Sequence, residues 1–261
     1  MELSLRHRTA VICGSTQGIG YGIAQELAGL GADCILLARN EAQLMVRSQA
    51  LPKTEGQQHG YRVADFTDTS AVRQAIDSIV ADTTVHILVN NTGGPAPGLI
   101  TQASPTAFTQ AFEQHLVNNQ TLVQAVLPGM RQAGYGRILN VISTSVRIPL
   151  RNLGVSNTIR GAVASWAKSL SNEVAADGIT VNNLLPGFIE TSRLESLIGT
   201  MAKARETDPE TIAQELRLEI PAGRFGKVHE IAALAAFLAS PAAAYINGTS
   251  ITVDGGRTGS I

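Results

Sequence analysis

Short apolar runs alternate with amphipathic stretches along this chain of 261 residues. The apolar runs have the length of strands, and they are continuously apolar, as strands buried on both faces are. The stretches between them carry apolar residues at helical spacing. The expected strands are Thr9–Cys13, Cys34–Leu37, Tyr61–Val63, Ile87–Val89, Arg137–Val141, Thr180–Leu184 and Ser250–Val253, and the expected helices are Gly20–Gly29, Glu41–Leu51, Thr69–Asp82, Pro105–Ala133, Ser156–Ala176 and Val228–Leu238.

This alternation predicts an α/β fold, a doubly wound Rossmann-type parallel sheet of about seven strands with helices on both faces. Because no linker, repeat or low-complexity block interrupts the pattern, one domain over residues 1–261 is expected. The segment Glu190–Ala222 departs from the pattern, since it is charged and irregular and lies between the sixth strand and the last helix. We interpret residues 190–222 as a substrate lid.

The composition limits the classes of partner that the protein is expected to bind. The net charge of −1 is spread along the chain, so no basic or acidic footprint indicates nucleic acid or a membrane surface. A small-molecule substrate is therefore favoured. Cys13 and Cys34 lie in expected strands, where a thiol behaves as a small hydrophobe, so neither a disulfide nor a metal site is expected. The sequence has no signal-peptide pattern and no long apolar run, which leads us to expect a soluble, cytoplasmic protein.

A glycine turn follows the first expected strand and opens a helix. It reads Gly14-Ser15-Thr16-Gln17-Gly18-Ile19-Gly20. Glycines in this context give a tight turn, let the backbone approach a pyrophosphate, and allow the helix to pack closely on the sheet. An ordinary strand-to-helix loop is the alternative, but the strand–turn–helix context favours a dinucleotide site.

Three residues separate the first two glycines, and this spacing resembles the short-chain dehydrogenase/reductase family. Further matches in the family's order extend the resemblance over essentially the whole chain. They are Asp65 after the third strand, Asn90-Asn91-Thr92-Gly93 after the fourth, Pro186-Gly187-Phe188-Ile189-Glu190-Thr191 after the sixth, and Asn247-Gly248-Thr249 and Val253-Asp254-Gly255-Gly256 near the C-terminus.

The resemblance implies a nicotinamide dinucleotide as cofactor. It implies that Asp65 contacts the adenine, although Asp65 could instead cap a helix, a role that Asp68 or Thr69 could equally fill. It also implies that the Asn90 segment steadies the central strands. The implied cofactor-binding residues are Gly14, Ser15, Gln17, Gly18, Ile19, Gly20, Arg39, Asp65, Asn91, Gly93, Arg160, Pro186, Gly187, Ile189 and Thr191.

The end of the second strand indicates which dinucleotide is bound. A carboxylate there would accept hydrogen bonds from the ribose 2′-hydroxyl and repel a 2′-phosphate. This chain has Leu37-Ala38-Arg39-Asn40 at that point, and the Arg39 guanidinium can clamp a phosphate, unless it is simply a solvated side chain. NADP(H) is thus preferred over NAD(H). Gln17 is a contrary sign, because NADP-binding relatives often carry a basic residue within the turn.

The catalytic positions depart from the family pattern. Relatives use a tyrosine as proton donor, a lysine four residues later, a serine earlier and an asparagine on the preceding helix. Ser143 matches the serine, whereas Ser156 stands at the tyrosine, Arg160 at the lysine and His115 at the asparagine. A serine hydroxyl is a much weaker acid than a phenol, and an arginine stays protonated. The tyrosines at positions 21, 61, 135 and 245 are not placed by sequence to replace the missing one.

His115 could deliver the proton, because an imidazole titrates near neutral pH. The alternative is a core histidine hydrogen-bonded to backbone. Charged residues of the lid segment, Arg193, Glu195 and Arg217, are interpreted as a solvated face.

Three functions remain open. The first is an NADP(H)-dependent oxidoreductase for a carbonyl or alcohol, with an atypical catalytic site and a resemblance to 3-oxoacyl-acyl-carrier-protein reductases. The second is a catalytically impaired protein that binds the dinucleotide as a regulator or sensor. Hydrolysis or dehydration by Ser143 and His115 ranks last, since no nucleophile elbow is present. The two long helices resemble those through which relatives pair, so a homotetramer or homodimer is expected.

Overall fold

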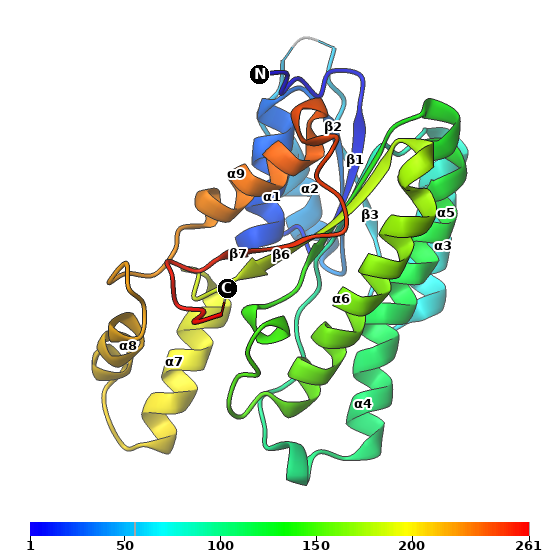
Figure 1. The fold of residues 1–261 in the computed structure, drawn as a ribbon. Helices are drawn as coiled ribbons and strands as arrows, with labels where there is room; N and C mark the ends of the chain where they lie inside the picture. Colours follow the sequence, from blue (N-terminus) through cyan, green and yellow to red (C-terminus); the bar gives the residue numbers. More distant parts are fainter. Residues whose placement is uncertain (55, 261) are drawn as a thin grey trace.

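The computed structural model describes residues 1–54 and 56–260, which form a parallel β-sheet covered by helices on both faces (Figure 1). The strand order is β3-β2-β1-β4-β5-β6-β7, and every neighbouring pair is parallel. The predicted doubly wound sheet is confirmed, with each expected strand within two residues of its observed bounds. The strands are β1 (Thr9–Cys13), β2 (Asp33–Ala38), β3 (Gly60–Val63), β4 (Ile87–Asn90), β5 (Gly136–Val141), β6 (Ile179–Pro186) and β7 (Ser250–Val253).

The helices fill the intervals between the strands, as the apolar spacing predicts. Short 3₁₀ turns occur between several of the longer elements. The α-helices are α1 (Gly18–Gly29), α2 (Glu41–Gln49), α3 (Thr69–Asp82), α4 (Pro105–Phe112), α5 (Asn118–Ala133), α6 (Gly154–Val174), α7 (Ser192–Ala204), α8 (Pro209–Leu218) and α9 (Val228–Ala239).

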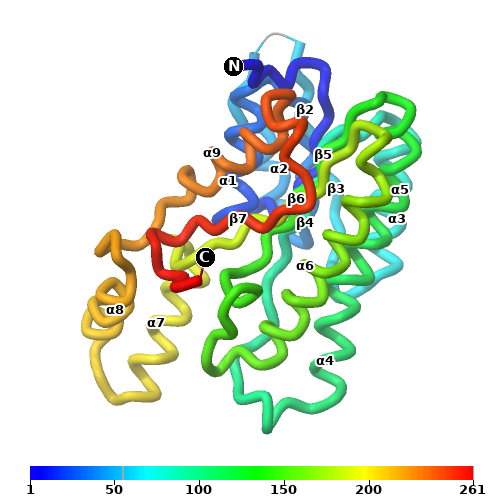
Figure 2. Tube along the Cα trace, viewed as in Figure 1, coloured from blue at the N-terminus to red at the C-terminus, as the bar shows by residue number. Residues whose placement is uncertain are grey.

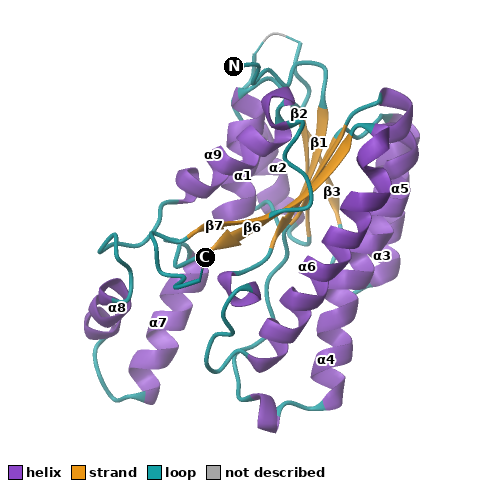
Figure 3. Cartoon of the chain, in the orientation of Figure 1, coloured by secondary structure: helices purple, strands orange, loops and turns teal. Residues whose placement is uncertain are grey.

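Two apolar cores lie on opposite faces of the sheet. On one face α1, α2 and α9 pack against the strands, and on the other α3, α5 and α6 do so (Figure 3). Residues of β1 alternate between them, so that Ile12 belongs to the first core and Val11 to the second. Burial on both faces explains why the strands read as continuous apolar runs.

Polar side chains bridge the strands on one side of the sheet. Asn90 donates to Asn140 at 2.8 Å, Asn140 to Asn183 at 2.9 Å, and Asn183 to the hydroxyl of Ser250 at 3.0 Å. These residues face one another in the strand register from β4 to β7. The contacts satisfy most of these buried polar atoms, Oδ1 of Asn90 excepted, and they hold the strand ends in register.

The expected single helix over Pro105–Ala133 is interrupted. Its middle turn, Glu113–Val117, is a π-helix that joins α4 to α5 and carries His115. A π-turn inserts one extra residue into a helix and rotates the side chains that follow, and such turns are frequent at functional sites. The polar and apolar pattern contains no signal for it.

The segment 190–222, whose irregular pattern predicts no helix, contains two helices, α7 and α8. Leu194, Ile198 and Ala202 lie one turn apart on α7 and face Ile212 and Leu216 of α8, so that the segment has a small core of its own. In Figures 1 and 2 both helices project beyond the carboxyl end of β6. Charged residues lie between these apolar positions, so the helical spacing is not evident in the sequence.

In the part of the chain that the structure describes, no helix is both long and apolar enough to cross a membrane. Cys13 and Cys34 are buried free thiols in β1 and β2. Burial raises the pKa of both, to about 12 for Cys13, so they are protonated at neutral pH.

Candidate active site

A cleft of about 510 Å³ opens at the carboxyl ends of the central strands. The strand order reverses between β1 and β4, and ligands of open α/β sheets bind outside the strand ends at such a point. Residues of the glycine turn, of the loops after β4, β5 and β6, and of α6 and α7 line it. The predicted site residues among them are Gly14, Gln17, Gly18, Ile19, Arg39, Asp65, Asn91, Gly93, Ser143, Ser156, Arg160, Pro186, Gly187, Ile189 and Thr191.

The glycine turn is held against the loop after β4. Gly14 has a φ of +60°, and a side-chain carbon added to it would lie 2.3 Å from the carbonyl oxygen of Asn91, so no other residue fits. The Asn91 amide donates to the carbonyls of Cys13 and Gly14 at 3.2 Å each. No described side chain caps the first turn of α1 at Gln17. Its free N–H groups are a ready site for a phosphate.

Two residues predicted to bind the cofactor shape the turn instead. Ser15 is fully buried, lies outside the cleft lining, and accepts a hydrogen bond from the backbone N–H of Leu37 at 3.1 Å. A side-chain carbon added to Gly20 would lie 2.3 Å from the carbonyl oxygen of Gly14, so Gly20 lets α1 approach the turn. The hydrogen bond of Ser15 thus ties the turn to β2, and the missing side chain of Gly20 lets α1 pack against the turn.

Arg39 and Asp65 lie together at the end of the cleft beyond β2. The nearby Arg39 guanidinium and, more strongly, hydrogen bonds from Thr67 lower the pKa of the Asp65 carboxyl. Asp68 caps α3 by accepting from the backbone N–H groups of Ser70 and Ala71, which leaves Asp65 facing the cleft. The helix-cap alternative for Asp65 is thus wrong.

A second arginine near this end comes from α2. The Nε of Arg47 donates to the carbonyl of Thr16 in the glycine turn at 3.2 Å, and its guanidinium stacks on the ring of Tyr21. Gln17 leaves the turn without a basic residue of its own, and Arg47 places a cation beside it. Because Arg47 lies on α2, well after the glycine turn in the sequence, the sequence did not indicate that it would contact the turn.

Two serines face the catalytic part of the cleft. The Ser143 oxygen accepts from the backbone N–H of Ser145 at 3.1 Å, so its own proton points elsewhere and can be donated. Ser156 lies in the first turn of α6, and its hydroxyl has no hydrogen-bond partner among the described residues. Both hydroxyls are available to a ligand in the same cleft.

Arg160 lies one turn after Ser156 on α6 and is 8% exposed. It donates to the carbonyl of Val141 at 3.1 Å and to that of Thr92 at 3.3 Å, and no described carboxylate pairs with it. Burial, and secondarily the charge of Arg193, lower the pKa of Arg160 to about 10. The side chain therefore remains a cation at neutral pH.

Arg193 of α7 is exposed, as expected of a solvated face, but it also lines the cleft. It reaches the carbonyl of Gly94 at 3.4 Å, on the loop that follows Gly93. A side-chain carbon added to Gly94 would lie 2.9 Å from Nη2 of Arg193 and 3.3 Å from Nη2 of Arg160. Arg193 stands two residues after Thr191, and this proximity to the expected nicotinamide end was the one available signal.

His115 is 1% exposed and lies outside the cleft lining. Its Nδ1 hydrogen-bonds the hydroxyl of Thr92 at 2.7 Å, whereas its Nε2 is buried without a partner in the described chain. Burial, with the charges of Arg160 and Arg193, lowers the pKa of His115 to about 3. At neutral pH the imidazole is uncharged, and the geometry does not favour direct proton delivery to a substrate. The hydrogen bond to a side chain also differs from the expected backbone contact.

No described tyrosine lines the cleft. Tyr135 precedes β5 and so lies at the amino ends of the strands, opposite the cleft. Its hydroxyl donates to the carbonyl of Ala239, and its ring lies 4.0 Å from the guanidinium groups of both Arg8 and Arg137. The cleft therefore lacks a phenol.

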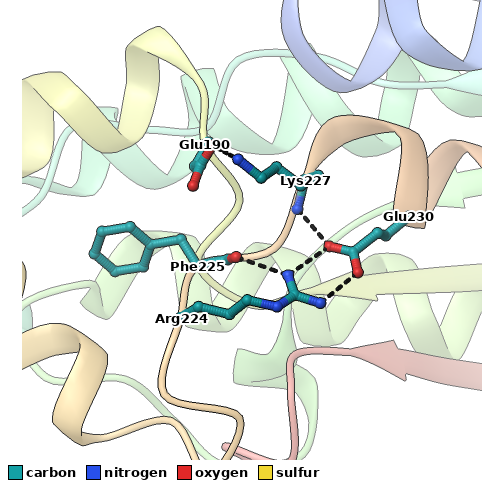
Figure 4. A network of polar contacts seen from close by, with 5 residues as sticks. All are labelled: Glu190, Arg224, Phe225, Lys227 and Glu230. Atoms are coloured by element: carbon teal, nitrogen blue, oxygen red, sulfur yellow. Dashed lines mark hydrogen bonds and ion pairs between the residues drawn. The ribbon is translucent and has the colours of Figure 1, made fainter.

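The base of the segment 190–222 is fixed by polar contacts, shown in Figure 4. Arg224 pairs with both carboxylate oxygens of Glu230 at 2.9 and 2.6 Å, which lowers the pKa of Glu230 to about 2. Lys227 pairs with Glu190 at 2.9 Å, and the Glu190 N–H donates to the carbonyl of Gly226. These contacts join the two ends of the segment, so that α7 and α8 rest on a defined base beside the cleft.

Fold and cleft together define a dinucleotide-binding protein with an oxidoreductase type of site. A family model described as enoyl-(acyl carrier protein) reductase matches residues 14–258. The chain belongs to the short-chain dehydrogenase/reductase family.

Its relatives are similar over their whole length. The 3-oxoacyl-[acyl-carrier-protein] reductase of Vibrio cholerae is 36% identical, covering 97% of this chain and 98% of the relative. The NADPH-dependent reductase BacG of Bacillus subtilis is 31% identical, covering 97% and 99%. Among solved structures, L-sorbose reductase from Gluconobacter frateurii, complexed with NADPH and L-sorbose, superimposes with a TM-score of 0.94 at 29% identity and covers 100% of both chains.

Proposed function

We propose that this protein is an NADP(H)-dependent oxidoreductase that reduces a carbonyl or oxidises the corresponding alcohol. The observation that carries the proposal is one continuous cleft that joins the uncapped glycine turn and Arg39 to the hydroxyls of Ser143 and Ser156. The cited relatives with NADPH in their names or complexes support the choice of cofactor. When bound, the cofactor donates or accepts a hydride.

The residues present fit such a cofactor. The first turn of α1 offers free N–H groups to the pyrophosphate, and Gly14 keeps the backbone clear of it. Arg39 holds the 2′-phosphate and Asp65 the adenine end. Gly93, Pro186, Gly187, Ile189 and Thr191 line the part of the cleft that leads to the two serines.

The chain's contribution to chemistry is orientation and charge. Ser143 and Ser156 donate hydrogen bonds to the substrate oxygen, and the cation of Arg160, one turn further along α6, adds positive charge to this part of the cleft. An alkoxide is basic enough to take its proton from water, so the missing phenol slows the reaction without preventing it. His115 acts as a positioning residue, because it holds Thr92, whose carbonyl accepts from Arg160. The segment 190–222 covers the substrate through α7.

One observation favours a second candidate, a dinucleotide-binding regulator or sensor, namely that the described cleft contains no tyrosine. The experiment that separates the two follows nicotinamide absorbance with NADPH and a panel of ketones, aldehydes and oxo acids, and with NADP⁺ and alcohols. Turnover of any compound supports the oxidoreductase. Saturable NADPH binding with no turnover across the panel supports the sensor and contradicts the proposal.

A further inference from the structure

Two guanidinium groups converge in the cleft with no anion between them. Arg160 comes from α6 and Arg193 from α7. A side-chain carbon added to Gly94 would lie within 3.3 Å of Nη2 of each of them. Neither pairs with a carboxylate in the part of the chain that the structure describes. By contrast, Arg205, Arg217, Arg224 and Arg257, also in or near the segment 190–222, each pair with a glutamate.

A buried cation is costly unless a counter-ion or hydrogen bonds compensate it. Arg160 is 8% exposed, and its guanidinium has two backbone carbonyls for its five N–H donors. Placing Arg193 beside it adds repulsion between like charges. Beneath the same loop, Nε2 of His115 is buried without a partner, and this neutral ring offers no negative charge. The two guanidinium groups thus have no counter-ion from the described chain, and their charge suits an oxyanion.

Resting on the proposed function, we propose that Arg160 and Arg193 bind the carboxylate of the substrate, and that the substrate is a short oxo acid. Two planar guanidinium groups suit the two oxygens of a carboxylate. Ser156 and Arg160 occupy the same face of α6, one helical turn or about 5.4 Å apart. With the substrate oxygen on Ser156, we assign the carboxylate to the arginine pair further along the same face of the helix, which suits an oxo acid whose two groups lie close together.

The position of Arg193 on the wall of the cleft agrees with a role in binding the substrate carboxylate. Arg193 stands in the first turn of α7, and Leu194 and Leu197 of the same helix line the cleft around it. Its side chain crosses from the segment 190–222 to Gly94 on the opposite wall. A carboxylate bound there links α7 to α6, so that binding of the anion also closes the segment over the reacting carbonyl.

A binding experiment tests the proposal without any turnover. Oxamate, an unreactive mimic of an oxo acid, is titrated into the protein saturated with NADP⁺, and oxamide, its uncharged counterpart, is titrated in parallel by calorimetry. We expect oxamate to bind at least about tenfold more tightly than oxamide, and Arg193→Gln to remove that preference. Lys203→Gln removes a charge from the exposed face of the same helix and should leave the preference intact. Equal affinities, or no oxamate binding to the wild-type protein, would overturn the proposal.

Two further measurements separate a substrate carboxylate from the cofactor's pyrophosphate as the bound anion, and separate failure of this inference from failure of the proposed function. If Arg193→Gln weakens NADPH binding about tenfold while oxamate binding is unchanged, the pair holds the cofactor's pyrophosphate and the substrate assignment is wrong. In turnover assays we expect a higher kcat/KM for acetoacetate than for its uncharged N-acetylcysteamine thioester, and the reverse order contradicts the inference while leaving the oxidoreductase function in place. Oxamate binding without turnover of these two compounds or of any member of the panel would instead contradict the proposed function alone.

Discussion

Arg39 is the residue to which we assign the choice between the two dinucleotides. It stands at the end of β2 where a carboxylate would repel a 2′-phosphate, and it faces Asp65 across the adenine end of the cleft. Arg47 adds a second cation beside the glycine turn. Both arginines are absent from the ion pairs of the described chain, so a phosphate would not have to displace an internal partner.

Replacing this arginine should alter the preference between the two dinucleotides. We expect Arg39→Gln to raise the dissociation constant of NADPH about tenfold or more and to leave that of NADH nearly unchanged, because only NADPH carries the phosphate. Fluorescence titration with each cofactor measures this. Arg73→Gln on the exposed face of α3 is the matched control. An equal loss of affinity for both cofactors would contradict the assignment.

The burial of His115 makes stability depend on pH. The unfolded imidazole takes up a proton near its ordinary pKa of 6.5, whereas the folded one stays neutral down to about 3. The unfolded state therefore binds more protons in this range, and the free energy of unfolding falls by about 1.4 kcal/mol per unit as the pH drops below about 6.5. We expect His115→Asn to flatten this decline, as measured by urea unfolding between about pH 4.5 and 7, the upper part of the window between the two pKa values. Parallel curves for the two proteins would show that His115 is not responsible.

The sequence predicts some site residues well and others poorly, for physical reasons. Gly14, Arg39, Asp65 and Ser143 follow strands directly, and parallel strands bring such positions to one edge of the sheet. The approach of Arg193 to the Gly94 loop beside Arg160 could not be predicted, because charged residues break up the apolar spacing of the helix that carries it. The burial of His115 depends on a π-turn, which leaves no mark in the apolar pattern.

At the scale of elements, the junction of β1, α1 and β4 fixes the cofactor site. Gly14 in its left-handed conformation packs against the backbone of Asn91, and Gly20 brings α1 against the same turn. The strands and most helices were predictable, because burial on two faces and helical spacing each leave a clear pattern. The two helices of the segment 190–222 were not, because their apolar positions serve a small separate core.

Crowding at this junction can be tested with a pair of glycine substitutions. Gly14→Ala places a methyl group 2.3 Å from the Asn91 carbonyl at a positive φ, and we expect a destabilisation of about 2 kcal/mol or more together with loss of NADPH binding. Gly29→Ala at the end of α1 meets nothing within 4 Å and should be neutral or slightly stabilising. Thermal unfolding and cofactor titration of both variants measure the difference. Equal behaviour of the two would contradict the close approach described for the turn.

For the molecule as a whole, we expect assembly through the helices that resemble those by which relatives pair. Phe112 at the end of α4 is 42% exposed, a large apolar side chain next to the π-turn. Light scattering after gel filtration should give the mass of two or four chains, and Phe112→Glu should lower it. Val46→Glu, at an exposed apolar position on α2, is the control. A monomer at every concentration would contradict the expectation.

The central claim is that this cleft transfers a hydride although it lacks the family's tyrosine. The most direct test incubates the protein with NADPH that carries deuterium at its transferable position and with a panel of ketones, aldehydes and oxo acids, and analyses the products by mass spectrometry. The account predicts deuterium on the former carbonyl carbon of at least one product, with the strongest transfer to a short oxo acid. Saturable binding of NADPH with no deuterium in any product would contradict it.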